Sequence, residues 1–139
     1  MEKPTPKYEF LEHTADIKIK LYGITLQEIF ENSVLAVADY MSEGKKISPN
    51  KVKIIDVKGD DVNSLLYNFI EDILYLVDAE GFIPAKASIT MRGNNLHAEL
   101  YGDDTKKYTL KHIKSPTYAE MIVKNDSKKK WIAQLVLDV

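Results

Sequence analysis

An uninterrupted apolar stripe over residues 62–77 constrains the fold more than any other feature of this chain. Its members recur at i, i+3, i+4 and i+7, the spacing of a helix that buries one face. Asp60 or Asp61 can cap the start and Gly81 the end. The sequence therefore predicts a helix between these caps, which has to pack against another element. The stripe consists of Val62, Leu65, Leu66, Phe69, Ile70, Ile73, Leu74 and Val77.

A second helix is predicted to follow Thr25. Thr25 and Glu28 form a capping box, in which the Thr25 hydroxyl accepts from the Glu28 amide and Glu28 reaches back. Residues 42–44 (Ser-Glu-Gly) mark its end. Its buried stripe is predicted to be Leu26, Ile29, Phe30, Ser33, Val34, Val37, Ala38 and Met41.

The remaining segments have the composition and alternation of strands. Residues 86–91 and 96–101 flank Gly93-Asn94-Asn95, a hairpin signal, and residues 102–104 are expected to turn the chain into a strand over 108–110. A strand-rich second half excludes a regular βαβ alternation. The predicted fold is therefore α+β: two amphipathic helices packed on mostly antiparallel β-sheet, in one compact domain spanning 1–139. Further strands are expected at 8–11, 17–22, 51–58, 117–124 and 131–137.

Composition narrows the classes of function. The 139 residues suit one domain with its own core, and 45% hydrophobic with 29% charged residues is typical of a soluble globular protein. A net charge of −2 favours neither nucleic acid nor a membrane as a direct partner. The absence of Cys excludes disulfides, thiolate catalysis and Cys-based zinc sites. Without an apolar leader or a run of membrane-spanning length, the expected location is cytoplasmic.

Two segments at opposite ends of the chain carry the candidate chemistry. The turn His13-Thr14-Ala15-Asp16 leads into an alternating strand, and the apolar run 131–137 ends in Asp138 and Val139. Terminal strands commonly pair. If these two do, Asp16, Asp138 and the Val139 carboxylate share one pocket of hard oxygen ligands, which calls for a cation.

Simpler interpretations remain open for each of these features. Thr14 and Asp16 suit local backbone bonds in an Asx or ST turn, with His13 packed or solvated, and the chain end can be frayed. The segment 111–118 holds Lys111, His112 and Lys114 before a strand. It is either a solvated edge that discourages aggregation or a cationic handle for phosphate or a carboxylate.

The usual catalytic signatures are missing. The sequence contains no P-loop, G-x-G-x-x-G, H-E-x-x-H or G-x-S-x-G motif. His13, His97 and His112 have no ligand spacing among themselves, and no nucleophile stands beside a base.

Four segments, in this order along the chain, together resemble the archease family. They are His13-Thr14-Ala15-Asp16, then Leu65-Leu66-Tyr67 with Phe69, then Ile113-Lys114 before Thr117-Tyr118, and the ending Gln134 to Val139. The resemblance covers essentially the whole chain. The turn by itself is a weak signal, and it becomes specific in combination with the penultimate Asp at this total length.

The resemblance implies a non-catalytic activator of the RtcB-type RNA ligase, which joins tRNA halves after intron removal. Such an activator promotes guanylylation of the ligase's active-site histidine, permits repeated turnover and broadens nucleotide use. It implies a divalent metal, with calcium as the associated ion, at Asp16, Asp138 and the Val139 carboxylate, and roles in activation for Lys114 and His13. The partner is then the ligase, with tRNA contacted only through it and no membrane involved.

Two other classes of function stand beside this one. A metal-dependent phosphoester hydrolase acting alone would use the same acidic residues, but a general base and the ligands of a second metal are not visible. A chaperone or adaptor would need an exposed apolar patch, and the apolar stripes are assigned to the core.

Overall fold

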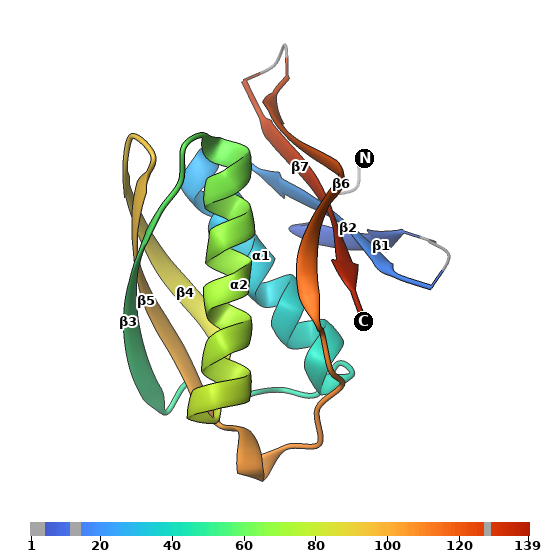
Figure 1. Ribbon diagram of the computed structural model, residues 1–139, viewed down its shortest axis with the longest axis vertical. Helices are drawn as coiled ribbons and strands as arrows, with labels where there is room; N and C mark the ends of the chain where they lie inside the picture. Colours follow the sequence, from blue (N-terminus) through green and yellow to red (C-terminus); the bar gives the residue numbers. More distant parts are fainter. Residues whose placement is uncertain (1–4, 12–14, 127–128) are drawn as a thin grey trace.

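The computed structural model describes residues 5–11, 15–126 and 129–139. Within them the chain forms two antiparallel sheets with two helices (Figure 1). One sheet has four strands in the order β1-β2-β7-β6, and the other has three in the order β3-β5-β4. The elements are β1 Tyr8–Leu11, β2 Ile17–Gly23, α1 Leu26–Ser42, β3 Lys51–Lys58, α2 Val62–Glu80, β4 Phe82–Arg92, β5 Asn95–Asp104, a 3-10 turn Thr105–Lys107, β6 Ser115–Asn125 and β7 Trp131–Asp138.

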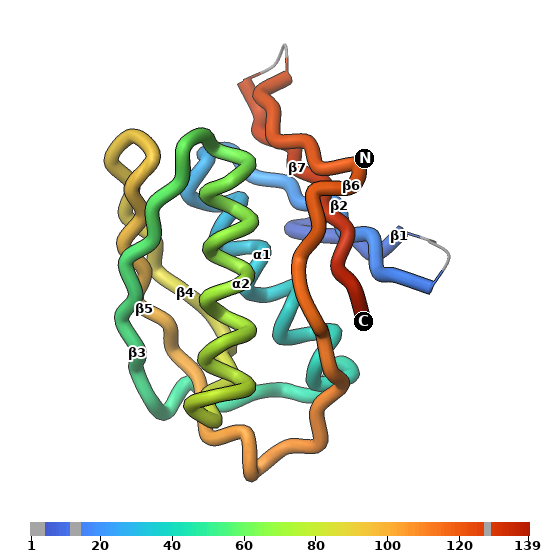
Figure 2. Tube along the Cα trace, in the orientation of Figure 1, coloured from blue at the N-terminus to red at the C-terminus, as the bar shows by residue number. Residues whose placement is uncertain are grey.

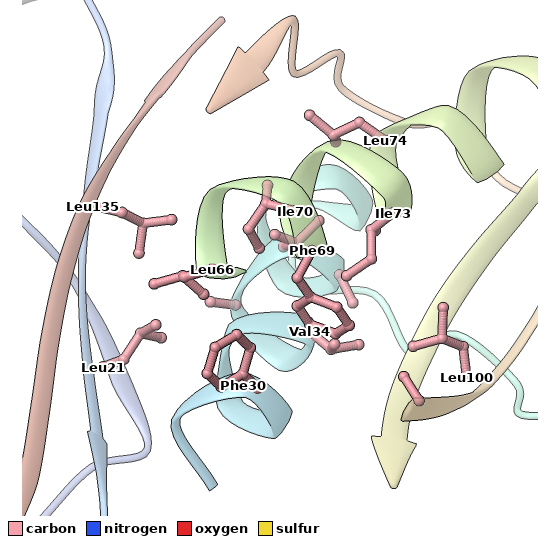
Figure 3. Packing of buried hydrophobic residues seen from close by; sticks show 14 of the residues in the cluster. Leu21, Phe30, Val34, Leu66, Phe69, Ile70, Ile73, Leu74, Leu100 and Leu135 are labelled. Atoms are coloured by element: carbon pink, nitrogen blue, oxygen red, sulfur yellow. The ribbon is translucent and has the colours of Figure 1, made fainter. Parts of the chain in front are cut away.

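The predicted α+β architecture is confirmed, and the strands divide into two sheets with the helices between them. The Cα trace shows α2 between the three-stranded sheet and β6, with α1 behind it (Figure 2). Side chains of both helices point into one core, which Leu21 and Leu135 close from one sheet and Leu100 from the other (Figure 3). Phe30 of α1 meets Phe69 of α2 edge to face, with ring centroids 5.6 Å apart.

Both helices begin and end where their caps predict. Thr25 accepts from the Glu28 amide at 3.2 Å, but Glu28 reaches back to the Ile24 amide rather than to that of the N-cap residue itself. α2 begins after Asp61, whose side chain accepts from the Ser64 amide at 2.7 Å. It ends at Gly81 with φ 65°, the left-handed conformation that glycine adopts without steric cost. The apolar stripes are therefore held facing the core, and their central members are fully buried.

The prediction for residues 102–110 is wrong. Residues 102–104 are the last part of β5, and the turn follows at Thr105–Lys107. Gly102 is there because β5 lies against the β4 backbone: an added Cβ would lie 2.0 Å from the Ile83 carbonyl oxygen. The glycine thus marks close approach of two strands, which local sequence does not distinguish from a turn.

The expected strand over 108–110 is an irregular segment instead. The Tyr108 hydroxyl accepts from the Ser48 amide at 3.0 Å and donates to the Asp103 carboxylate at 2.9 Å. The Lys111 amide donates to the Met41 carbonyl at 2.8 Å. The polar groups of this segment are thus hydrogen-bonded to side chains and to the main chain of α1. The segment therefore needs no partner strand. β4 is also longer than predicted, beginning at Phe82, with an irregularity between Pro84 and Lys86.

Candidate functional site at the end of the four-stranded sheet

The two strands next to the candidate aspartates pair with each other, as predicted: β2 and β7 are antiparallel neighbours. Ile17 lies opposite Leu137 in the register. Asp16 immediately precedes Ile17 and Asp138 immediately follows Leu137, so both aspartates lie at the same end of the pair. Paired strands are about 4.8 Å apart, which brings residues 16 and 138 into one neighbourhood. Val139 follows directly, and all three residues are half-buried.

Lys114 is held at this same end by β6. Ser115 lies opposite Asp138 in the β6–β7 register, and the Lys114 amide donates to the Asp138 carbonyl at 2.8 Å. Lys114 itself is exposed. We call Asp16, Lys114, Asp138 and Val139 the strand-end site. The structure therefore brings together four of the five residues expected to matter, and the fifth, His13, lies outside the described residues.

The backbone leading into Asp16 is unusual. Ala15 has φ 69°, in the left-handed region that residues with a Cβ rarely adopt. Such residues cost free energy and persist where their surroundings require them, often at functional sites. The strained residue lies directly before a proposed ligand, Asp16.

The strand-end site has the chemistry of an oxygen-donor cation site. Asp16 and Asp138 contribute carboxylates, a terminal carboxylate on Val139 would add a third, and hard cations such as Ca²⁺ prefer such ligands. Over residues 5–11, 15–126 and 129–139, no three His, Cys, Asp or Glu side chains gather as a metal-binding group. Asp16 and Asp138 alone supply two carboxylates, so other oxygen atoms would have to complete the coordination of a cation here.

Other acidic residues have structural partners and lie outside the strand-end site. Asp103 is buried, and its carboxylate accepts from the Asp104 amide, from Tyr108 and from Lys107, whose Nζ is 3.1 Å away. The bond from the Asp104 amide, with those from Tyr108 and Lys107, holds the pKa of Asp103 below its usual range, although burial opposes the shift. The Asp104 side chain accepts from the Lys106 amide at 2.9 Å and so starts the 3-10 turn.

The two basic residues before Lys114 also have partners of their own. Lys111 lies 3.6 Å from Glu43 and over the Tyr40 ring, 5.2 Å from its centroid. His112 lies 3.9 Å from Asp78. The three basic residues are thus divided: Lys111 and His112 contact Glu43, Tyr40 and Asp78 near the ends of α1 and α2, and the main chain of Lys114 is bonded to Asp138.

A surface hollow of about 610 Å³ lies at the opposite end of the β2–β7 pair, where Gly23 lies opposite Trp131. Tyr22, Trp131, Glu28 and Lys130 are among its lining residues. None of the strand-end residues lines it.

Sequence reasoning did not find the contact between Tyr67 and Tyr118. Their rings stack 4.3 Å apart between centroids, with planes at 6° to each other. One residue comes from α2 and the other from β6. Both tyrosines belong to the segments that resemble the archease family, but nothing in the local sequence indicates that their rings are in contact.

The fold and the strand-end site define a class of protein. It is an α+β protein with two sheets, in which strand pairing brings candidate metal ligands from distant parts of the sequence together. The family model that matches this chain is described as the archease protein family (MTH1598/TM1083), over residues 8–139. The chain is 37% identical over 140 residues to the protein archease of Pyrococcus abyssi and 40% over 141 to that of Pyrococcus furiosus. Each match covers 96% of this chain and 99% of the relative. The chain belongs to the archease family.

Two solved structures share the fold. The solution structure of protein 1598 of Methanobacterium thermoautotrophicum has a TM-score of 0.74 at 23% identity, covering 96% of this chain and 99% of that one. The crystal structure of an archease from Thermotoga maritima, described there as a possible chaperone, has a TM-score of 0.70 at 21% identity, covering 100% and 98%. At these identities the likeness supports the fold. In the described parts of the chain, neither helix has the length and apolar character needed to cross a bilayer.

Proposed function

We propose that this chain is a non-catalytic activator of an RtcB-type RNA ligase, acting in the cytoplasm during tRNA splicing. Membership of the archease family supports the class of activity. The observation that carries the proposal is the meeting of Asp16, Asp138 and Lys114 at one sheet end, through the Ile17–Leu137 register and the Lys114–Asp138 bond. These three residues belong to the segments that resemble the family, and they lie far apart in the sequence.

The proposed metal ligands are Asp16, Asp138 and the terminal carboxylate of Val139, and the proposed ion is Ca²⁺. Three carboxylates can supply several of the 6–8 oxygens that calcium takes. When bound, the ion would neutralise the carboxylates and offer positive charge to phosphate oxygens. The site lies at the end of a sheet, where the active site of a partner protein can approach it.

Lys114 supplies a second positive charge beside the aspartates. An exposed ammonium with three donors attracts a triphosphate as a point charge, and its main-chain bond to Asp138 keeps its base in place. We propose that Lys114, together with His13, positions the nucleotide triphosphate or its metal during guanylylation of the ligase. Contact with tRNA then occurs only through the ligase.

The test is a ligation assay with and without this protein, repeated in the presence of a chelator. With a limiting amount of ligase from the same source, this chain is expected to convert a single round of tRNA-half joining into many rounds. After chelation, the divalent ion that the ligase itself requires is added back first, and Ca²⁺ is then added separately. The two additions distinguish the metal requirement of the ligase from that of this chain. Ligation that is as extensive without the chain as with it would refute the proposal.

A companion assay addresses the hydrolase alternative. The protein is incubated alone with RNA and divalent ions, and an activator leaves the RNA intact. Cleavage that is lost in the Asp16→Ala variant would replace the activator proposal with a phosphoester hydrolase. Asp56→Ala is a matched control, because Asp56 is exposed on the three-stranded sheet, away from the strand-end site.

A further inference from the structure

An exposed aromatic stack joins α2 to β6, which lie side by side in Figures 1 and 2. Tyr118 stacks on Tyr67 and is nonetheless 55% exposed, and Ile122 further along β6 is 42% exposed. Large apolar surface left in water is costly. A stacked pair held between two elements and open on one side is therefore a suitable anchor for another protein.

Three carboxylates come from the part of α2 that carries Tyr67 and from the residues just before it. Asp60 and Asp61 precede α2, and Glu71 lies one turn after Tyr67 on the helix. Burial raises the pKa of Tyr118 above its ordinary value, and the charges of Tyr67, Asp61, Glu71 and Asp60 raise it further. We call Asp60, Asp61, Tyr67, Glu71 and Tyr118 the tyrosine surface.

The tyrosine surface continues along β6 toward the strand-end site. Ser115, the first residue of β6, lies opposite Asp138, and Tyr118 is three residues further on. At about 3.3 Å per residue, three residues of strand span roughly 10 Å. A protein that receives the strand-end site therefore reaches the tyrosine surface as well.

We infer that the tyrosine surface docks a lysine- or arginine-bearing segment of the ligase while the strand-end site acts. The identity of this partner rests on the proposed function. Cations are attracted by the face of a tyrosine ring, and carboxylates pair with guanidinium and ammonium groups, so the surface is complementary to a basic segment in both respects. RNA is disfavoured, because its phosphates would be repelled by Asp60, Asp61 and Glu71.

The experiment measures affinity for the ligase with Tyr118→Ala and Glu71→Lys, each at low and at moderate salt. Both variants are expected to bind at least tenfold more weakly. Glu71→Lys is expected to lose most of the salt dependence, since it removes a charge pair. Tyr118→Phe keeps the ring and is expected to bind within about twofold of the unmodified chain. Matched controls on the outer face of the three-stranded sheet are Tyr101→Ala and Asp56→Lys, which are expected to bind normally.

The outcomes separate the two proposals. Unchanged affinity of both variants, in a chain that still activates the ligase, overturns the docking surface and leaves the proposed function standing. Failure of the unmodified chain to bind or activate the ligase overturns both. If circular dichroism shows that Tyr118→Ala is unfolded, Glu71→Lys decides, because Glu71 is an exposed helix position. If changing one basic residue of the ligase to an acidic one restores the affinity of Glu71→Lys, that residue is the contact. If the chain binds single-stranded RNA and both variants weaken this binding, the assignment of the surface to a protein partner is overturned.

Discussion

The amide of Lys114 donates a hydrogen bond to the carbonyl of Asp138 at 2.8 Å. The lysine is therefore placed beside the aspartate by its main chain, while its exposed side chain is left to act on something else. Removing the side chain does not remove the bond that positions it. Function and folding are thus separable at this residue.

Lys114→Ala is expected to lower ligase activation strongly, because it removes the proposed cation without disturbing the β6–β7 register. Stability should change by no more than about 0.5 kcal/mol, as is usual at exposed positions. Multiple-turnover ligation and thermal unfolding measure the two effects. Lys114→Arg keeps the charge and should retain part of the activity. Full activation by Lys114→Ala would remove this residue from the proposed site.

Asp16→Asn and Asp138→Asn are each expected to weaken Ca²⁺ binding at least tenfold, because the amide keeps the shape but loses the charge that a hard cation prefers. Calorimetric titration with calcium chloride measures this, and Asp56→Asn should bind as the unmodified chain does. One glycine added after Val139 would move the terminal carboxylate and is expected to weaken binding similarly. Equal affinity in all these variants would show that the ion binds elsewhere.

Gly102→Ala is expected to lower the free energy of unfolding by about 1–3 kcal/mol or more, the usual cost of overpacking. The reason is that the added Cβ would lie 2.0 Å from the Ile83 carbonyl oxygen. Gly93→Ala is the comparison: its Cβ meets nothing within 4 Å, but φ is +58°, so it pays a conformational cost of about 1 kcal/mol. Urea unfolding measures both. Equal losses would argue against the close approach of β4 and β5.

Tyr8 gives the protein an alkaline pH dependence. Its hydroxyl donates to Asp39 at 2.8 Å, and burial, with this bond and the Asp39 charge, raises the pKa of Tyr8 to about 12. The unfolded phenol ionises near pH 10. The contribution to stability is therefore complete below pH 10 and lost as the pH rises from 10 to 12.

Tyr8→Phe should cost about 1 kcal/mol below pH 10, the value of one hydrogen bond. It should also make the free energy of unfolding fall less steeply between pH 10 and 12. Urea unfolding at several pH values measures the slope. A decline remains from Tyr22, whose pKa burial and Glu9 also raise to about 12. An identical slope in Tyr8→Phe would show that the pKa of Tyr8 is not raised in the folded protein.

Local features of the sequence predict the helices well and the segment after β5 poorly. The α2 stripe and its caps at Asp61 and Gly81 are properties of neighbouring residues, so spacing alone finds them. Gly102 and the aspartates after it have the composition of a turn. A glycine is needed at position 102, however, because Ile83 of another strand lies against it. The irregular course of residues 108–110 likewise depends on Ser48 and Met41, which lie far away in the sequence. Such long-range contacts are not encoded in periodicity.

The candidate site shows the same division. The acidic turn and the acidic chain end can be recognised separately, and the family resemblance joins them. Whether Asp16 and Asp138 lie together depends on the Ile17–Leu137 register, which only the folded sheet supplies. The Tyr67–Tyr118 stack depends on α2 packing against β6, and alternation along β6 is interrupted between Thr117 and Ile122, so a period-2 pattern does not predict which side chains face the helix.

The strand order also bears on how the molecule is assembled during synthesis. β7 lies between β2 and β6, so β2 is synthesised long before β7, the strand with which it pairs. Until then one edge of β2 has no neighbour, and the nascent chain carries an open edge of the kind that pairs with other polypeptides. Insertion of β7 closes that edge and brings Asp16, Lys114 and Asp138 together in one event, so a folding intermediate without β7 has no strand-end site.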